Sequence, residues 1–267
     1  MNLDTLLNHF GLATPPFARA VPEAGLLRHK SFAEALTRLS LAVESRTPAL
    51  LTAEPGLGKS TLLGVFADAL DKGRTRLVYT PLCSCGPFGL IGQLATRYGV
   101  RARRSAAQTA QAMLDELARS DKKEILVLDD AHRLPDHSLD ELRLLSNLDF
   151  DRTPPFSLLL VGQSLLRERL TQNGLLALAQ RLAIRTSLGP LSEPDSLDYL
   201  DRRLRAAGAR ATLFRPSASA RVFEKTSGVP RLINNLATAA LLAAASRGRK
   251  HVELEDVDDA VFDLENN

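Results

Sequence analysis

Long hydrophobic runs are missing from this sequence of 267 residues. The longest apolar stretch, residues 237–245, is interrupted by Thr238, and it is far shorter than the roughly 20 residues that a membrane span requires. The first ten residues lack the basic start and the apolar run of a secretory signal. The sequence therefore predicts no contact with a membrane, and we expect a cytoplasmic location.

Cysteine is almost absent, with Cys83 and Cys85 as its two occurrences. Their C-x-C spacing is too close for an easy disulfide, and two thiols are too few for a zinc site. The histidines show no spacing typical of metal ligands. We therefore expect free thiols in a reducing compartment and no metal site built from Cys or His.

Lysine and arginine are missing from residues 251–267, which hold seven acidic side chains. The chain has 34 basic and 31 acidic side chains in total, so its first 250 residues hold 34 basic against 24 acidic ones, a balance of +10. A basic body with an acidic tail permits a polyanion as a partner. The hydrophobic content of 45% is enough for a core, in one large domain or a domain with a small satellite.

Apolar runs bounded by turn residues alternate with helical patterns, which is typical of βαβ units and a parallel sheet. The expected strands are residues 49–52, 76–80, 124–129, 157–162 and 183–187. The expected helices are residues 31–44, 59–70, 88–98, 107–119, 138–148 and 175–181. The sequence therefore predicts an α/β fold.

Beyond residue 190 only helical patterns remain, at residues 193–207, 216–225, 230–247 and 254–264. This change predicts a small all-helical domain of residues 191–267. The sheet is expected in a first domain of residues 1–190, with residues 1–30 as an N-terminal extension.

Residues 51–60, LTAEPGLGKS, run from a hydrophobic strand into a glycine-rich turn that ends in Lys-Ser. Backbone N–H groups around Gly56 and Gly58 can converge on a phosphate, because neither residue has a side chain in the way. Lys59 is expected to bridge the β- and γ-phosphates, and Ser60 to offer its hydroxyl to Mg²⁺. The candidate nucleotide-binding residues are Glu54, Pro55, Gly56, Leu57, Gly58, Lys59, Ser60 and Thr61.

The loop departs from G-x-x-x-x-G-K-[ST] at one position, where Ala53 replaces the first glycine. That position closes the strand, and the later glycines make the turn that faces the phosphates. Alanine fits there if its φ angle is negative. We therefore expect a small effect on affinity.

Two carboxylates, Asp129 and Asp130, follow the buried run ILVL about 65 residues beyond Lys59. Asp129 is expected to hold Mg²⁺ from the end of its strand. Asp130 occupies the position of the base that polarises the attacking water, where Glu is more common, and the shorter side chain predicts slow turnover. The alternative for the pair is an ordinary turn or helix cap.

Three further side chains are candidates for the chemistry. Arg181, in AQRLAIR, is the first candidate for an arginine that a neighbouring subunit supplies to the γ-phosphate, with Arg185 as its competitor. Arg231 follows the turn Gly-Val-Pro at a helix start. Gln163, after the fourth strand, could sense the γ-phosphate or orient the attacking water. The alternatives are solvated arginines and an amide that caps backbone.

Arg101, Arg103 and Arg104 form the most evident basic cluster, between two expected helices. Such a loop can follow a phosphate backbone without contacting bases. No aromatic residue is interleaved, so stacking on single strands is not indicated. A solvated charge run is the alternative, and both remain open.

With these residues in place, the chain resembles the AAA+ ATPases of the ExeA/GspA type and the related transposition regulators of the TnsC, TniB and MuB kind. The resemblance extends from about residue 3 to residue 264. It is carried by F-G-L…P-P-F (10–17), AEPGLGKST, LVLDDAHRL, ELRLLSNL (141–148), LLLVGQSLLRERL, QRLAIR, LGPLS and GVPRLINNLATAALLAA.

The resemblance implies a P-loop αβα sandwich, a helical lid, and ATP with Mg²⁺ bound between the subunits of a ring or filament. It implies the following roles: Lys59 and Ser60 as Walker A, Asp129 and Asp130 as Walker B, Gln163 as sensor 1, Arg181 as arginine finger, and Arg231 as sensor 2.

The surroundings of the module favour one branch of the family. Secretion-type members look like the same ATPase module, followed by a membrane anchor and a peptidoglycan-binding region. We expect neither of these regions here, because the sequence ends soon after the lid. The favoured hypothesis is a helper that assembles on duplex DNA with ATP and recruits or stimulates a transposase or another recombination protein. The alternatives are a secretion-system assembly ATPase and a nucleotide-dependent scaffold with little hydrolysis.

Overall fold

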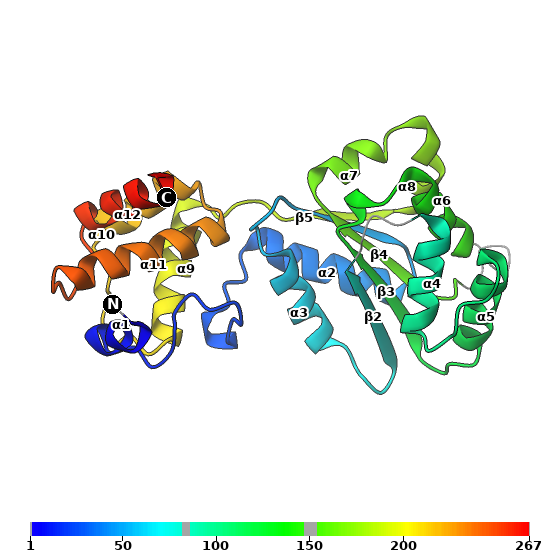
Figure 1. The fold of residues 1–267 in the computed structure, drawn as a ribbon, viewed down its shortest axis with the longest axis horizontal. Helices are drawn as coiled ribbons and strands as arrows, with labels where there is room; N and C mark the ends of the chain where they lie inside the picture. The colour runs from blue at the N-terminus through cyan, green and yellow to red at the C-terminus, as the bar shows by residue number, and fades with distance from the viewer. Residues whose placement is uncertain (1, 82–85, 147–153, 267) are drawn as a thin grey trace. The chain divides into compact units, whose positions relative to one another are not determined.

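The computed structural model describes residues 2–81, 86–146 and 154–266. The chain forms two compact units (Figure 1). The helical unit comprises Met1–Lys30, Gly56–Gly58 and Gly189–Asn267, and the sheet unit comprises Ser31–Pro55 and Lys59–Leu188. Cys83 and Cys85 lie outside the described residues, as do the last two residues of the motif ELRLLSNL. Within the described ranges, none of the helices combines the length and the hydropathy that a membrane span needs.

Five parallel strands form the sheet, in the order β2-β3-β4-β1-β5. Their bounds are Ala49–Thr52 (β1), Thr75–Pro81 (β2), Lys123–Asp129 (β3), Ser157–Gly162 (β4) and Ile184–Ser187 (β5). The predicted parallel α/β fold is confirmed. Because the strands are parallel, their carboxyl ends lie at one edge of the sheet.

The helices of this unit are α2 (Lys30–Glu44), α3 (Lys59–Ala69), α4 (Pro87–Arg97), α5 (Ala106–Ala118), α6 (Asp136–Leu145), α7 (Ser164–Arg169) and α8 (Leu176–Arg181). Short 3₁₀ turns are η2 (Ala131–Arg133) and η4 (Asn173–Leu175). Helix α7 was not predicted, because its six residues are too few to show a helical period.

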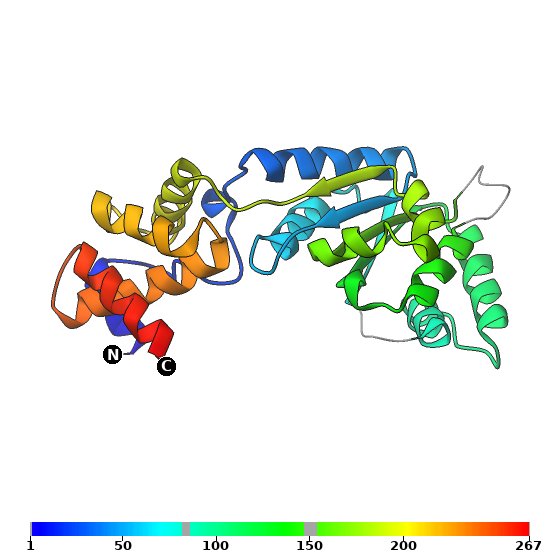
Figure 2. The ribbon, with the colours of Figure 1, turned by 90° about the horizontal axis from the view of Figure 1, so that it is seen from above.

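Alternate side chains of the central strands point to opposite faces of the sheet. Leu126 and Leu128 of β3 belong to the hydrophobic cluster that contains the inner side chains of α4 to α8. Ile125 and Val127 are equally buried and face the other way. Figure 2 shows α2 on the face opposite to the helices of residues 87–145. The sheet unit is therefore the predicted αβα sandwich.

The helical unit contains α1 (Leu3–Phe10), η1 (Glu23–Gly25), α9 (Glu193–Ala206), α10 (Pro216–Thr226), α11 (Pro230–Ser246) and α12 (Leu254–Asn266). Its core is a second hydrophobic cluster, to which all four C-terminal helices contribute. The chain leaves the sheet unit at Leu188, beside the predicted boundary at residue 190.

The N-terminal residues pack with the helical unit, whereas the prediction attached residues 1–30 to the sheet domain. Leu6 and Phe10 join the helical core. Arg203 of α9, only 2% exposed, donates to the carbonyl oxygens of Pro16 (2.9 Å) and Ala18 (2.7 Å). A sequence pattern carries no sign of contacts between segments about 185 residues apart.

The acidic tail is neutralised within the helical unit. Asp256 is fully buried and pairs with Arg247 (2.7 Å) and Arg249 (3.1 Å). Further pairs are Arg215–Glu253, Arg221–Asp258, Arg247–Asp259 and Arg249–Glu255. These five acids therefore do not form a free acidic tail.

Candidate functional site

The loop of residues 53–61 leads from β1 to α3. Ala53 is 2% exposed, has a negative φ angle, and donates its N–H to the carbonyl oxygen of Gly162 (3.0 Å). Alanine thus fits the strand end where the motif usually has glycine, as the sequence predicted.

The two later glycines have the left-handed backbone that favours glycine, with φ of +90° at Gly56 and +97° at Gly58. A Cβ atom added at Gly58 would meet nothing within 4 Å, so the space beside this residue is open. Helix α3 begins at the next residue, and its N-terminal amides favour an anion. The loop therefore fits a phosphate group.

Lys59 is folded onto the loop. Its Nζ donates to the carbonyl oxygens of Ala53 (2.6 Å) and Glu54 (3.2 Å). The carboxylate of Glu54 accepts the N–H of Ser164 at the start of α7 (3.3 Å). Hydrogen bonding to Ser164, and then the charges of Lys59 and His132, hold the pKa of Glu54 below its usual value. The ionised carboxylate of Glu54 therefore connects the phosphate loop to the start of α7.

Asp129 ends β3 with both carboxylate oxygens engaged. Oδ1 accepts the N–H of Asp130 (2.8 Å), and Oδ2 accepts the phenol O–H of Tyr79 on β2 (2.7 Å). Burial, reinforced by this hydrogen bond, raises the pKa of Tyr79, so the phenol remains a donor. A carboxylate has about four acceptor sites, so sites remain for Mg²⁺. With Ser60 exposed on α3, the oxygen donors fit this hard cation.

Sequence patterns missed Tyr79. The available signal was the position of Tyr79, two residues before the end of β2, in the strand that pairs with β3 and so lies beside Asp129. Neighbouring parallel strands bring such side chains together only if their order is known.

Asp130 adopts a left-handed backbone, with φ of 53° and ψ of 31°. Its carboxylate lies 3.9 Å from Nδ1 of His132, whose side chain is 11% exposed. The same nitrogen faces the N–H of Gln163 at 3.5 Å. The sequence assigned no role to His132, and the structure places it between two predicted site residues.

Gln163 leaves the carboxyl end of β4. Since β4 lies between β3 and β1, Gln163 emerges between Asp130 and the phosphate loop. It precedes α7, and its side chain makes no capping bond to that helix. The structure thus brings Lys59, Asp129 and Gln163 to one edge of the sheet.

Arg181 and Arg185 lie elsewhere in the sheet unit. Arg181 ends α8, just before the amino end of β5, and the four residues of this strand span about 13 Å. Arg185 donates to the carbonyl oxygens of Leu182 (2.9 Å) and Ala179. The guanidinium of Arg185 therefore binds the carboxyl end of α8, the helix that precedes its strand. Both arginines come before the carboxyl end of β5, whereas the phosphate loop follows the carboxyl end of the neighbouring strand β1.

Arg231 is exposed in the first turn of α11. Its N–H donates to the carbonyl oxygen of Gly56 (3.3 Å), and both residues belong to the helical unit. The preceding turn needs glycine, because a Cβ atom at Gly228 would lie 2.0 Å from the carbonyl oxygen of Leu191.

The three clustered arginines, Arg101, Arg103 and Arg104, are all exposed just before α5. Together with Ala102 and Gln108 they line an open hollow of about 540 Å³. In the described parts of the chain, none of the three guanidinium groups is paired with a carboxylate.

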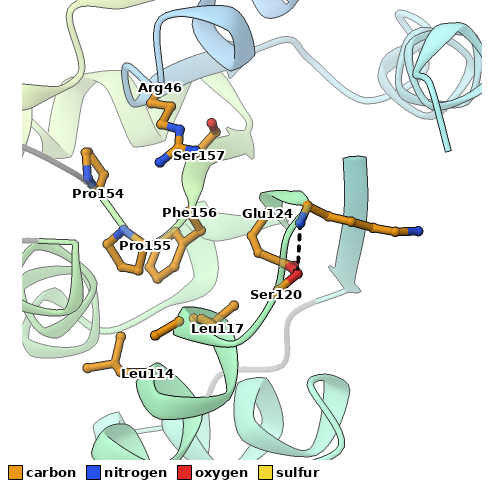
Figure 3. A pocket seen from close by; sticks show the side chains of 11 residues that line it. Arg46, Leu114, Leu117, Ser120, Glu124, Pro154, Pro155, Phe156 and Ser157 are labelled. Atoms are coloured by element: carbon orange, nitrogen blue, oxygen red, sulfur yellow. Dashed lines mark hydrogen bonds between the residues drawn. The ribbon is translucent and has the colours of Figure 1, made fainter. Parts of the chain in front are cut away.

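A further hollow of about 360 Å³ lies at the amino ends of β3 and β4 (Figure 3). Glu124 lines it with a carboxylate that accepts the Ser120 hydroxyl (2.6 Å) and lies 3.9 Å from Arg76. Leu117 and Phe156 provide apolar walls. It contains none of the predicted site residues and lies at the edge of the sheet opposite to Asp129.

Comparisons with known proteins show what this chain is similar to. The model of an AAA domain matches residues 43–170. General secretion pathway protein A of Aeromonas hydrophila is 30% identical over 262 residues, which are 96% of this chain and 48% of that protein. The chain thus spans about half the length of this relative. The predicted resemblance to AAA+ ATPases of the ExeA/GspA type is confirmed.

Solved structures share the fold. Cdc6p from Pyrobaculum aerophilum has a TM-score of 0.74 at 21% identity, over 93% of this chain and 70% of that one. The Aeropyrum pernix ORC1 protein in complex with DNA has a TM-score of 0.67 at 20% identity, over 93% and 67%. The Thermotoga maritima RuvB branch migration motor has a TM-score of 0.58 at 20% identity, over 88% and 70%.

Proposed function

We propose that this chain, which resembles the AAA+ ATPases of the ExeA/GspA type, binds ATP with Mg²⁺ and hydrolyses the bond between the β- and γ-phosphates. One observation carries the proposal. The phosphate loop, Gln163 and the pair Asp129–Asp130 follow three adjacent strands, β1, β4 and β3, at one edge of the sheet. Phosphoryl transfer requires mainly that the reacting groups are positioned and that the developing charge on the phosphates is stabilised. A phosphate-binding loop, two carboxylates and an amide are groups of the types that this reaction uses.

Each group has a defined role in this proposal. The loop amides and Lys59 hold the phosphates, and Ser60 and Asp129 hold the metal ion. When bound, Mg²⁺ offsets the charge that develops between the β- and γ-phosphates. Asp130 accepts the proton of the attacking water, and Gln163 orients that water. Arg231 is proposed to contact the phosphates as sensor 2.

We further propose that ATP promotes assembly into a ring or filament. Arg181 supports this step, because it lies at the amino end of β5, far from the phosphate loop of its own chain. An arginine in this place can complete only the site of a neighbouring subunit. Arg185 is the less suitable finger, because its guanidinium is already bound to two carbonyl oxygens of its own chain.

The proposed macromolecular partner is duplex DNA, and the assembled protein is proposed to recruit or stimulate a transposase. The cluster of Arg101, Arg103 and Arg104 supports DNA binding, because its charges are not offset by carboxylates in the described residues. Exposed guanidinium groups of this kind bind phosphate oxygens and release counterions.

A second candidate function is that of a secretion-system assembly ATPase. It is favoured by the 30% identity to general secretion pathway protein A. The third candidate is a nucleotide-dependent scaffold with little hydrolysis, which is favoured by the short carboxylate at Asp130.

The test combines ATP turnover with DNA binding. The protein is incubated with duplex DNA and ATP, ADP or a non-hydrolysable analogue, and salt-sensitive assemblies are sought. We expect turnover and ATP-dependent assembly on DNA, both lost in Lys59→Ala. Turnover without DNA association favours the secretion candidate. ATP-dependent assembly without turnover favours the scaffold, and no ATP binding at all refutes the proposal.

A further inference from the structure

Arg169, the last residue of α7, holds the chain that follows β3. Its Nη1 donates to the carbonyl oxygen of His132 (2.6 Å), and its Nη2 donates to that of Leu134 (2.8 Å) and to the carboxylate of Asp136. Its side chain is only 18% exposed. One planar guanidinium therefore fastens a five-residue segment by three acceptors, and no predicted role accounts for it.

The fastened segment, residues 132–136, begins two positions after Asp130, which has the left-handed backbone that L-residues rarely adopt. Asp130 is held on its amino side by β3 and by its N–H bond to Asp129 (2.8 Å). On its carboxyl side, its carbonyl oxygen accepts the N–H of Arg133 (2.9 Å), which belongs to the segment that Arg169 holds. Arg169 thus completes the restraint on Asp130.

The segment that Arg169 holds also contacts Gly162 and Gln163 at the end of β4. A Cβ atom at Gly162 would lie 3.3 Å from the backbone nitrogen of His132, so β4 approaches the segment closely. The N–H of Gln163 faces Nδ1 of His132 at 3.5 Å. Asp130 and Gln163 are therefore both located relative to one segment, and Arg169 connects that segment to the end of α7.

We propose that Arg169 is a positioning residue for hydrolysis, which sets the separation between Asp130 and Gln163 around the attacking water. This inference rests on the proposed ATPase function. A planar fork that serves two carbonyl oxygens and a carboxylate cannot be replaced by an ammonium, which is a single compact charge. Lysine in this place keeps the charge but loses the geometry.

The test compares Arg169→Lys and Arg169→Gln with Arg167→Gln, an exposed arginine of the same helix. Three quantities are measured: kcat, the Kd for ATP, and hydrogen exchange at the amides of residues 131–134. Because small displacements of a catalytic group cost up to about 100-fold, we expect kcat to fall about 10- to 100-fold in both Arg169 variants. Exchange should rise, the Kd for ATP should stay unchanged, and Arg167→Gln should match the wild type.

Each result decides the inference. Unchanged exchange or unchanged kcat in Arg169→Lys overturns it while the ATPase proposal stands. A parallel loss of ATP binding also overturns it, because the role would then be general stability. Absence of turnover in the wild type overturns both proposals together. If Arg169→Gln does not fold, Arg169→Lys decides, since it retains a positive charge near Asp136.

Discussion

Replacing Arg101, Arg103 and Arg104 together by Gln is the change that best separates the proposed DNA function from the secretion candidate. All three side chains are exposed around one hollow of about 540 Å³. Each arginine that binds a phosphate contributes about 0.9 to the slope of log K against log salt. The three together predict a slope flatter by about 2.7, if each meets one phosphate.

The size of the effect follows from this slope. Raising salt from about 50 mM to about 200 mM is a fourfold change, so the affinity advantage of the wild type should shrink about 40-fold over this range. The assay is fluorescence anisotropy on a labelled duplex with a non-hydrolysable ATP analogue, at several salt concentrations. Several unrelated duplex sequences should give the same slope change, because phosphate contacts carry no sequence information.

The matched control removes the same charge at arginines that already have partners. Arg74, Arg119 and Arg143 of the sheet unit lie 3.6, 3.3 and 2.6 Å from Asp71, Glu116 and Asp140. Such surface pairs contribute about 0–1 kcal/mol to stability, so their replacement by Gln leaves the fold intact. If the control and the cluster variant flatten the slope equally, net charge explains binding and the assignment of the cluster is wrong.

Two further changes test the site and the fold. Tyr79→Phe removes a hydrogen bond to the charged Asp129, and a hydrogen bond of this kind is typically worth about 1.5–3 kcal/mol. The Mg²⁺ concentration for half-maximal turnover should therefore rise about tenfold or more. An unchanged Mg²⁺ titration would show that Tyr79 is dispensable. Tyr98→Phe is the control, since the Tyr98 hydroxyl is buried without a hydrogen-bond partner in the described residues. Asp256→Ala removes the buried carboxylate that Arg247 and Arg249 share, while each arginine keeps a second acidic partner. The loss of hydrogen bonds to a charged group should lower the free energy of unfolding by about 1.5–3 kcal/mol. The measurement is urea denaturation against Asp258→Ala, whose more exposed pair should cost about 0–1 kcal/mol. Burial alone raises the pKa of Asp256, but the Glu253 N–H, Arg247 and Arg249 hold this pKa below its usual value. The stabilisation by the carboxylate is therefore present above the unfolded pKa of about 3.9 and is lost as the pH falls through the lower folded pKa. The pH profile of Asp256→Asn should lack this loss.

The sheet and much of the site were predictable, because their signals are local. Continuous apolar runs such as ILVL identify buried parallel strands, and Asp129 follows one of them directly. Glycines before Lys59 identify the turn by their spacing. Parallel strands then bring these ends to one edge without further information.

What sequence patterns missed depends on contacts between distant segments. Tyr79 meets Asp129 only because β2 is the neighbour of β3. Arg169 meets the carbonyl oxygen of His132 across 37 positions, and Arg203 meets Pro16 across 187. Arginines that bind carbonyl oxygens leave no charge pattern, because their partner is backbone that every residue has. The helical period of α9 places Arg203 on the same face as Tyr199 and Leu200, but it does not identify the backbone that Arg203 binds.

The structure also changes the meaning of the short carboxylate at Asp130. From the sequence, Asp in place of Glu is a loss of reach toward the water. The backbone there is left-handed, at φ 53°, a conformation in which Asp is several-fold enriched. The residue type therefore suits the turn that carries it. The distance between the Asp130 carboxylate and the attacking water must then be set by the position of the turn, and in this chain that position depends on the contacts of Arg169. Asp130 and Arg169 are accordingly expected to act as one unit, with the effects of replacing both smaller than the product of the separate effects.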